Sequence, residues 1–341
     1  MKQLLVIRLS AMGDVAITVP VLLAFQEQYP DMKIILLTKP IFAPMFASLP
    51  NCEVFPIDLK GKHKGFLGLY RLFKELKAKK IDFVADLHNV LRSNVLKIFF
   101  KWNNIPFFQI NKGRKEKKAL TRAKNKEFRQ LKTSYERYAD VFEKLGFPIS
   151  LEKKYFLMKK MPSKNVKKLL SEEKNIGIAP FASHLGKEYP FENLKKVIFQ
   201  LSKVYPKAKI FIFGGGNHEK QIVEQISSLV NVENMVGKLP FYEELNLISH
   251  LDVMLAMDSG NAHLAAMYGV PTITLWGVTH PFAGFYPYEQ PKENALLADR
   301  EKFPLVPTSV YGNKYPYGYE RAIMSISEEN IFQKIVEILE K

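Results

Sequence analysis

The chain has 341 residues, of which 47% are hydrophobic, and its 50 Lys and Arg against 34 Asp and Glu give a net charge of +16. A single core usually stops growing at this length, so two domains are expected. The only cysteine, Cys52, excludes an internal disulfide and a cysteine-based zinc site, and it suits a reducing cytoplasm. No run approaches the roughly 20 apolar residues of a membrane-spanning helix, and the N-terminus lacks signal-peptide features, so we expect a soluble or peripheral protein.

Strand and helix patterns alternate along the first half of the chain. Short apolar runs predict strands at residues 4–7, 34–37, 53–57 and 83–87, and helical spacing predicts helices at residues 15–28, 66–76 and 90–100. The clearest amphipathic pattern runs from Phe128 to Leu145, and Gly146 and Pro148 end it. The basic stretch at residues 159–168 predicts a linker.

A second alternating series follows this linker. It predicts strands at residues 175–180, 210–213, 253–257 and 272–275, and helices at residues 191–204, 261–268 and, after Ser327, at the C-terminus. Residues 278–320 are rich in Pro, Gly and Tyr and predict long loops. The alternation indicates an α/β protein with parallel sheets, organised as two Rossmann-like domains that face a cleft. Ligands of such sheets bind at the carboxyl ends of strands, so the loops after strands are the candidate sites.

The first candidate loop is Arg8-Leu9-Ser10-Ala11-Met12-Gly13-Asp14. Gly13 permits a tight turn or a close approach of a ligand. Asp14 opens the next helix, where a carboxylate is either a cap or a base, and the sequence leaves both interpretations open. The loop is not the G-x-G-x-x-G fingerprint of dinucleotide binding, which argues against a nicotinamide enzyme.

The second candidate loop is Asp258-Ser259-Gly260-Asn261-Ala262-His263, after the strand at 253–257. Free backbone N–H groups and the helix dipole favour an anion at a helix start, and Ser259 adds a hydroxyl. Asp258 either binds a sugar hydroxyl or caps the helix. His263 considered alone would be a packed or solvent-facing helix residue, whereas within a phosphate-binding turn it becomes a plausible ligand contact.

Two further loops follow strands. Ser183-His184-Leu185-Gly186-Lys187-Glu188-Tyr189-Pro190 contains Lys187, which would offer a point charge to a diphosphate, although a loop lysine is usually just solvated. Gly214-Gly215-Gly216-Asn217-His218-Glu219 either admits a nucleotide beside the backbone or is an ordinary flexible turn.

Most of the positive charge lies in two stretches of the first half. Residues 112–132 carry a net charge of +8 and residues 58–80 a net charge of +6. This concentration favours an anionic acceptor or a membrane surface. Aromatic residues do not interleave with the basic ones at 112–132, so a nucleic-acid platform is not favoured. The seven histidines are scattered without the spacing of metal ligands, and there is no Asp-x-Asp sequence to hold a metal–diphosphate.

These motifs together resemble glycosyltransferase family nine, the ADP-heptose:lipopolysaccharide heptosyltransferases. The likeness covers essentially the whole chain, and the motifs that carry it are Arg8–Val15, Asp86-Leu87-His88 with Arg92-Ser93, Lys187-Glu188-Tyr189-Pro190, and Met257–Ala266 continuing to Trp276-Gly277. The resemblance implies a GT-B fold and an inverting, metal-independent transfer without a cofactor. It also implies that the protein is cytoplasmic and peripheral at the inner face of the membrane.

The resemblance further implies roles for individual residues. Asp14 would be the general base. The donor nucleotide sugar would be held by Ser10, Gly13, Ser183, Lys187, Glu219, Asp258, Ser259, Gly260, Asn261, Ala262 and His263. The anionic lipopolysaccharide precursor would be held by Arg8, Arg92, Lys112, Arg114 and Lys115.

The expected domains are an acceptor domain at residues 1–160, a donor domain at residues 161–322 and a C-terminal helix at residues 323–341 that packs back toward the first domain. One alternative is the same fold acting on another nucleotide sugar for a surface glycan. The other is a non-catalytic basic protein that binds polyanions or anionic lipid.

Overall fold

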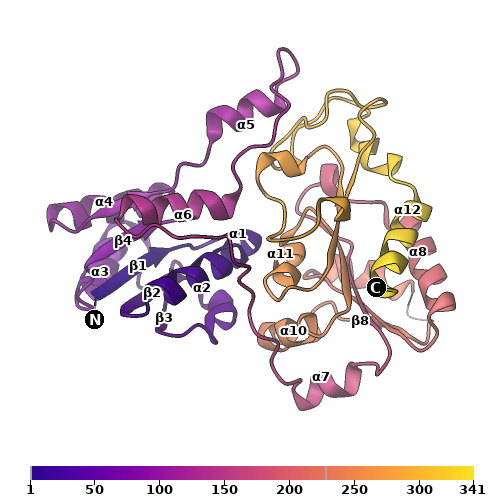
Figure 1. The fold of residues 1–341 in the computed structure, drawn as a ribbon, viewed down its shortest axis with the longest axis horizontal. Helices are drawn as coiled ribbons and strands as arrows, with labels where there is room; N and C mark the ends of the chain where they lie inside the picture. The colour runs from indigo at the N-terminus through magenta and orange to yellow at the C-terminus, as the bar shows by residue number, and fades with distance from the viewer. Residues whose placement is uncertain (1, 227–228) are drawn as a thin grey trace. The chain divides into compact units, whose positions relative to one another are not determined.

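The computed structural model describes residues 2–226 and 229–341, which form two compact units. Unit 1 comprises Met1–Lys112 and Ser134–Leu157, and unit 2 comprises Gly113–Thr133 and Met158–Lys341. The chain therefore passes between the units three times. Both units are α/β, with strands that are all parallel to their neighbours (Figure 1).

Unit 1 contains a five-stranded sheet in the order β3-β2-β1-β4-β5. Its strands are β1 (Lys2–Ile7), β2 (Met32–Thr38), β3 (Cys52–Pro56), β4 (Phe83–Asp86) and β5 (Phe107–Gln109). Its helices are α1 (Met12–Ala16), α2 (Thr18–Gln28), the 3-10 helix η1 (Pro40–Phe46), α3 (Gly65–Lys77), α4 (Leu91–Trp102) and α6 (Ser134–Lys144).

The sheet of unit 1 is buried on both faces, which is why its central strand reads as a continuous apolar run. On one face, Leu5 and Ile7 of β1 pack in a core with side chains of α3 and α4. On the α2–α6 side, Phe25 of α2 and Phe142 of α6 contact each other with ring centroids 5.1 Å apart.

Unit 2 contains a six-stranded sheet in the order β11-β10-β9-β6-β7-β8. Its strands are β6 (Asn175–Ala179), β7 (Lys209–Ile212), β8 (Val232–Asn234), β9 (Val253–Met257), β10 (Thr272–Trp276) and β11 (Ala295–Leu297). Its α-helices are α5 (Arg114–Thr121), α7 (Lys164–Leu169), α8 (Phe191–Val204), α9 (Asn217–Glu224), α10 (Phe241–Ile248), α11 (Gly260–Ala266) and α12 (Glu328–Leu339). Its 3-10 helices are η2 (Leu185–Lys187), η3 (Pro281–Ala283), η4 (Lys292–Asn294) and η5 (Tyr319–Ser325).

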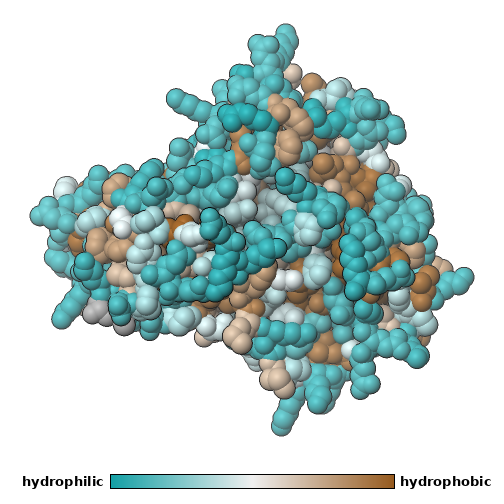
Figure 2. Space-filling model, in the orientation of Figure 1, coloured by the Kyte–Doolittle hydropathy of each residue, from teal (hydrophilic) through white to brown (hydrophobic). Residues whose placement is uncertain are grey.

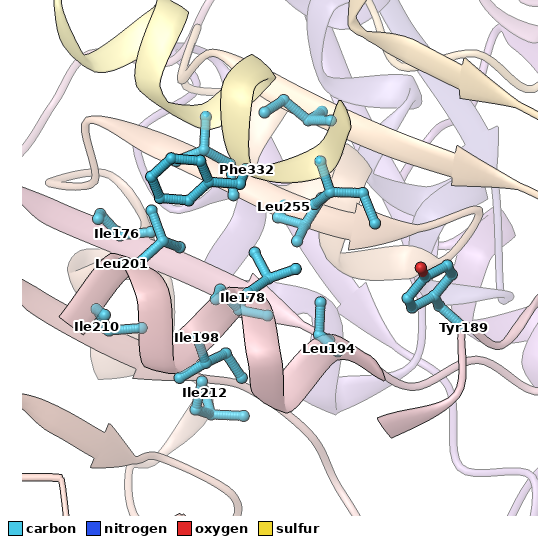
Figure 3. Packing of buried hydrophobic residues seen from close by; sticks show 14 of the residues in the cluster. Ile176, Ile178, Tyr189, Leu194, Ile198, Leu201, Ile210, Ile212, Leu255 and Phe332 are labelled. Carbon is cyan, nitrogen blue, oxygen red and sulfur yellow. The ribbon is translucent and has the colours of Figure 1, made fainter. Parts of the chain in front are cut away.

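The C-terminal helix α12 belongs to the core of unit 2. Phe332 is buried with Ile176 of β6, Leu255 of β9 and Leu201 of α8 (Figure 3). Ile335 belongs to the same buried cluster. Ser327 caps this helix by accepting a hydrogen bond from the Asn330 N–H, as its sequence predicts. The helix that we expected to form a separate C-terminal element is therefore part of the second unit.

The predicted long helix from Phe128 to Leu145 is wrong in its first part, because the observed helix α6 begins only at Ser134. The ring of Phe128 packs on His280 and Phe282, with centroids 5.0 and 4.9 Å away. The N–H of Leu131 donates to the Phe282 carbonyl. Tertiary contacts within unit 2 therefore account for the apolar side chains at 128 and 131.

The observed boundaries differ from the expected domains at residues 113–133. We placed this basic segment in the first domain, but it folds with unit 2. Lys126 donates to the carbonyls of Leu305 and Pro307, and Lys117 Nζ lies 3.8 Å from the centroid of the Phe285 ring. The later boundary, at residues 157 and 158, lies close to the expected position near 160.

Candidate active site

Each unit has the strand order of a doubly wound sheet, in which the order reverses beside the first strand. The reversal lies between β1 and β4 in unit 1 and between β6 and β9 in unit 2. Ile7 of β1 is paired with Leu37 of β2 and with Asp86 of β4, so these three strands end at the same edge of the sheet. Loops that follow the strands at such a reversal form the ligand sites of open α/β sheets. Four of the predicted motifs lie at the carboxyl ends of β1, β4, β6 and β9. Three of them follow their strand, and the motif that begins with Asp86 starts at the last residue of β4.

In unit 1, Arg8 holds Asp14. The Arg8 guanidinium forms an ion pair with Asp14 through Nη2 and Oδ2, and its Nη1 donates to the Leu87 carbonyl at 2.5 Å. The Arg8 side chain is 6% exposed and that of Asp14 is 27% exposed. The Tyr138 hydroxyl donates to the Asp14 backbone carbonyl at 3.3 Å. Arg8, predicted as an acceptor contact, is thus buried and engaged with the carboxylate, which stays open to a ligand.

Beside this pair, Asp86 organises the loop after β4. Its buried carboxylate accepts the N–H groups of His88 and Asn89, both at 2.9 Å, and an amide N–H of Gln109 at 2.8 Å. Ser10 Oγ lies 3.5 Å from His88 Nε2. The loops after β1 and β4 therefore form one site in unit 1.

His88 is a neutral side chain in a positive environment. Burial, and after it the charges of Arg8, Lys112 and Lys39, lower the pKa of His88 to about 3. Lys39, directly after β2, was not predicted as a site residue. Its charge and that of Lys112 make this edge of unit 1 suited to an anionic ligand.

Replacement of His88 by Gln is expected to change how stability depends on pH. The folded pKa of about 3 lies below the ordinary value of about 6.5, so the unfolded chain binds more protons between these values and wild-type stability falls as pH falls through them. Urea unfolding of both proteins at about pH 7.5 and pH 5 should show wild type losing more stability on acidification than His88→Gln. The same loss in both proteins would contradict this assignment, and His218→Gln, at an exposed histidine, is the control.

In unit 2, Lys187 is paired with Asp258. Lys187 Nζ lies 2.7 Å from Asp258 Oδ2 and donates to the Asp258 carbonyl at 3.3 Å. The two side chains are 12% and 7% exposed. The motifs after β6 and β9 therefore meet at one point, and Lys187 is not the merely solvated loop lysine that the sequence also allowed.

Gly312 positions Lys187, and no sequence motif marks this glycine as part of the site. This glycine has a φ of +81°, which L side chains rarely adopt, and a Cβ added there would lie 2.6 Å from Lys187 Cγ. The carbon stem of Lys187 therefore runs directly over the Gly312 backbone. Gly186 is similarly close-packed, because its Cβ would lie 2.6 Å from the Gly312 carbonyl oxygen.

The turn after β9 holds polar atoms with unused hydrogen-bonding capacity. Ser259 has extended backbone angles at the start of α11, and its side chain does not cap the helix. Ser259 Oγ and Asn261 Oδ1 are buried and have no hydrogen-bond partner among the described residues. Buried polar oxygens of this kind fit contacts to a bound ligand. Ala262 and His263 are buried within the helix, and Gly260 is half-buried at its first position.

The remaining predicted donor residues lie on neighbouring loops. Glu219 of α9 folds back on the glycine-rich turn after β7, where its carboxylate accepts the Gly215 N–H at 2.7 Å. Ser183 is exposed in the loop after β6. Ser10 and Gly13, which were assigned to the donor, belong to unit 1.

The predicted acceptor residues are divided between the units. Arg92 is exposed on α4, and Lys112 is half-buried at the end of the first part of unit 1. Arg114 and Lys115 are exposed on α5, which belongs to unit 2. Within residues 2–226 and 229–341, no group of three or more His, Cys, Asp and Glu side chains has an arrangement that could hold a metal ion. In the same residues, no helix combines the length and apolar character needed to span a bilayer.

Comparison with known proteins agrees with the resemblance drawn from the motifs. The lipopolysaccharide core heptosyltransferase OpsX of Haemophilus influenzae is 27% identical over 286 residues, which cover 82% of this chain and 80% of that protein. Among solved structures, a family 9 glycosyl transferase from Veillonella parvula superposes with a TM-score of 0.75 at 20% identity, covering 99% of this chain and 97% of that one. The ADP-heptose heptosyltransferase II of E. coli gives a TM-score of 0.69 at 18% identity, with 99% and 98% covered.

These likenesses identify the fold as GT-B, with one Rossmann-like unit in each half of the chain. The sequence model of glycosyltransferase family 9 (heptosyltransferase) matches residues 69–313, which include the end of β4 and both strand ends at the reversal in unit 2. The chain belongs to glycosyltransferase family 9, and the protein is a glycosyltransferase.

Proposed function

We propose that the protein is an inverting, metal-independent heptosyltransferase that moves heptose from ADP-heptose to the lipopolysaccharide inner core. The observation that carries the proposal is the Lys187–Asp258 pair beside the open oxygens of Ser259 and Asn261 in unit 2. A cation and hydrogen-bonding groups at a strand-order reversal suit a nucleotide diphosphate. Two of the relatives named above are named as heptosyltransferases, and one of these two is named for ADP-heptose.

In the proposed reaction, Asp14 accepts the proton of an acceptor hydroxyl while that oxygen attacks the anomeric carbon of the donor sugar. The attack comes from the face opposite the diphosphate, so the configuration inverts. Arg8 fixes the direction of the Asp14 carboxylate through their ion pair. The bond to the diphosphate breaks, and ADP leaves. Exclusion of water during this step would protect the donor from hydrolysis.

The leaving diphosphate would be stabilised by charge and hydrogen bonds from unit 2. Lys187 is the cation, and the Ser259 hydroxyl and the backbone N–H groups at residues 260–263 are the donors. On donor binding, the Lys187 ammonium group would pair with the diphosphate in place of Asp258. The Asp258 carboxylate would then be able to accept a hydrogen bond from the sugar. These groups would do the work that a metal ion does in other sugar transferases.

The acceptor would meet the positive edge of unit 1. Lys39 and Lys112 act electrostatically on His88, and Arg92 is exposed nearby in sequence on α4. Phosphates and acidic sugars of a lipid-linked core precursor suit these charges. We place the protein at the inner face of the cytoplasmic membrane, and we expect no nucleic-acid partner.

Release of ADP from a panel of nucleotide sugars, with and without a deep-core lipopolysaccharide acceptor, tests this proposal. We expect turnover with ADP-heptose that depends on the acceptor and persists in EDTA. If only another ADP- or UDP-linked sugar is turned over, that sugar and not heptose is the group transferred. Loss of activity in EDTA that magnesium restores would contradict metal independence. Salt-sensitive polyanion binding without turnover of any donor would favour the non-catalytic alternative.

A further inference from the structure

Unit 1 carries a group of exposed aromatic side chains on α3 and α4. Phe66, Tyr70 and Trp102 are 65%, 41% and 78% exposed. Their ring centroids lie 5.6, 5.4 and 6.4 Å from that of Phe99, which is buried between the helices. Since all three rings contact the same buried ring, they form one continuous surface.

Aliphatic side chains extend this surface. Leu67 of α3 is 80% exposed, and Ile98 of α4 is 49% exposed. Leu91, which is 81% exposed, lies seven residues before Ile98 and eleven before Trp102, so the three share one face of α4. We call Phe66, Leu67, Tyr70, Leu91, Ile98 and Trp102 the α3–α4 patch. Contiguous exposed apolar surface of this kind marks an interaction site.

The border of the α3–α4 patch is cationic. The two helices carry six Lys and Arg residues and a single acid, Glu75, which is engaged by Lys62 and His63. Lys74 Nζ lies 4.8 Å from the centroid of the Tyr70 ring. Figure 2 shows apolar colour interspersed with hydrophilic side chains over the end of unit 1 that carries α4.

We propose that the α3–α4 patch docks on the surface of an anionic phospholipid bilayer. Aromatic rings suit the boundary between headgroups and acyl chains, and lysines around them suit anionic headgroups. Two copies of the same cationic border would repel each other, which argues against self-association through this face. Because Leu91 follows His88 by only three residues, the patch leads up to the unit 1 site. Docking there would bring that site to the surface where a lipid-linked acceptor is held, a consequence that rests on the proposed function.

Vesicle flotation with matched variants tests the docking surface. The patch variant is Phe66→Ser/Leu67→Ser/Trp102→Ser, and the control variant is Phe199→Ser/Tyr242→Ser, whose side chains are 58% and 60% exposed in unit 2. With phosphatidylcholine vesicles containing roughly 30% phosphatidylglycerol, we expect the patch variant to bind at least about tenfold more weakly than wild type. The control variant should bind within about twofold of wild type. Circular dichroism and the thermal midpoint verify that both variants are folded.

Tryptophan fluorescence gives an independent measurement. The chain has two tryptophans, Trp102 in the patch and Trp276, which is 1% exposed in the core of unit 2. Anionic vesicles should shift the emission of wild type to the blue, and brominated lipids should quench it. Trp102→Phe should keep the binding and lose both signals. Equal vesicle binding by wild type and the patch variant, or emission that vesicles leave unchanged, would overturn the proposal.

Enzyme assays separate this proposal from the proposed function. With a water-soluble acceptor fragment, the patch variant should release ADP at the wild-type rate, whereas with acceptor in vesicles it should be slower. If no donor is turned over but the patch variant still loses vesicle binding, the proposed function fails and the docking surface stands. If ADP-heptose is turned over and both variants bind vesicles like wild type, the docking surface fails alone.

Discussion

Asp14→Asn should lower kcat on the order of 100- to 10,000-fold, because it removes the proposed general base while keeping the shape of the side chain. The amide oxygen can still accept a hydrogen bond from Arg8, so KM should change little. Steady-state ADP release with saturating donor and acceptor measures the effect. Turnover near the wild-type rate would remove Asp14 from the catalytic role.

Two measurements distinguish a loss of catalysis from a loss of folding in Asp14→Asn. Asp14→Asn leaves the Arg8 guanidinium, 6% exposed, with a weaker partner, so the variant should also be somewhat less stable. The thermal midpoint then sets an assay temperature at which the variant is folded. Asp31→Asn, at an exposed carboxylate of the same unit, should leave both kcat and stability nearly unchanged.

Lys187→Ala should weaken donor binding and turnover together and should destabilise the protein. The substitution leaves the Asp258 carboxylate, 7% exposed, without its cation, and breaking a buried pair from one side costs about 3–5 kcal/mol. It also removes the charge proposed to meet the diphosphate. Calorimetry with ADP measures the binding loss, and urea unfolding measures the stability loss. Unchanged ADP binding would take Lys187 out of the donor site.

A double variant separates the two effects. Lys187→Met/Asp258→Asn removes both charges and keeps similar volumes, so it should regain much of the stability that Lys187→Ala loses. It should not regain ADP binding, because the cation is still missing. Gly312→Ala keeps both charges but places a methyl group 2.6 Å from Lys187 Cγ, so it should displace the ammonium group and weaken ADP binding. Recovery of ADP binding in the double variant would mean that Lys187 only neutralises Asp258.

The parallel strands and the strand-end motifs could be predicted because they are local patterns. Buried runs such as Leu4–Ile7 are continuous in sequence, and parallel topology then places their ends at one edge. The partners of the motif residues could not be predicted. Gly312 contacts Lys187 from a distant loop whose composition indicates only irregular structure, and nothing in its own sequence marks it as part of the site.

The Phe128–Leu145 helix shows where periodicity misleads. Apolar residues at spacings of three and four satisfy the helical pattern whether or not they face one core. Here Tyr138 and Phe142 are buried in unit 1, whereas Phe128 and Leu131 pack in unit 2. The division between units falls within the pattern, and the helix starts only after it. The ion pair of Arg8 could not be predicted for a related reason, because its charge was visible in the sequence but its burial against Asp14 was not.

Because residues 113–133 fold with unit 2, they can reach their final contacts only after most of unit 2 has been synthesised. Leu131 leaves the ribosome about 150 residues before Phe282, its hydrogen-bonding partner, which at about 5–20 residues per second is a delay of roughly 8–30 s. Unit 1 has all its residues once Leu157 has emerged, so this segment must wait as a solvated loop on a nascent domain. Until then, the many lysines and arginines of this segment surround Phe128 and Leu131 with charge, which keeps this stretch of chain well solvated.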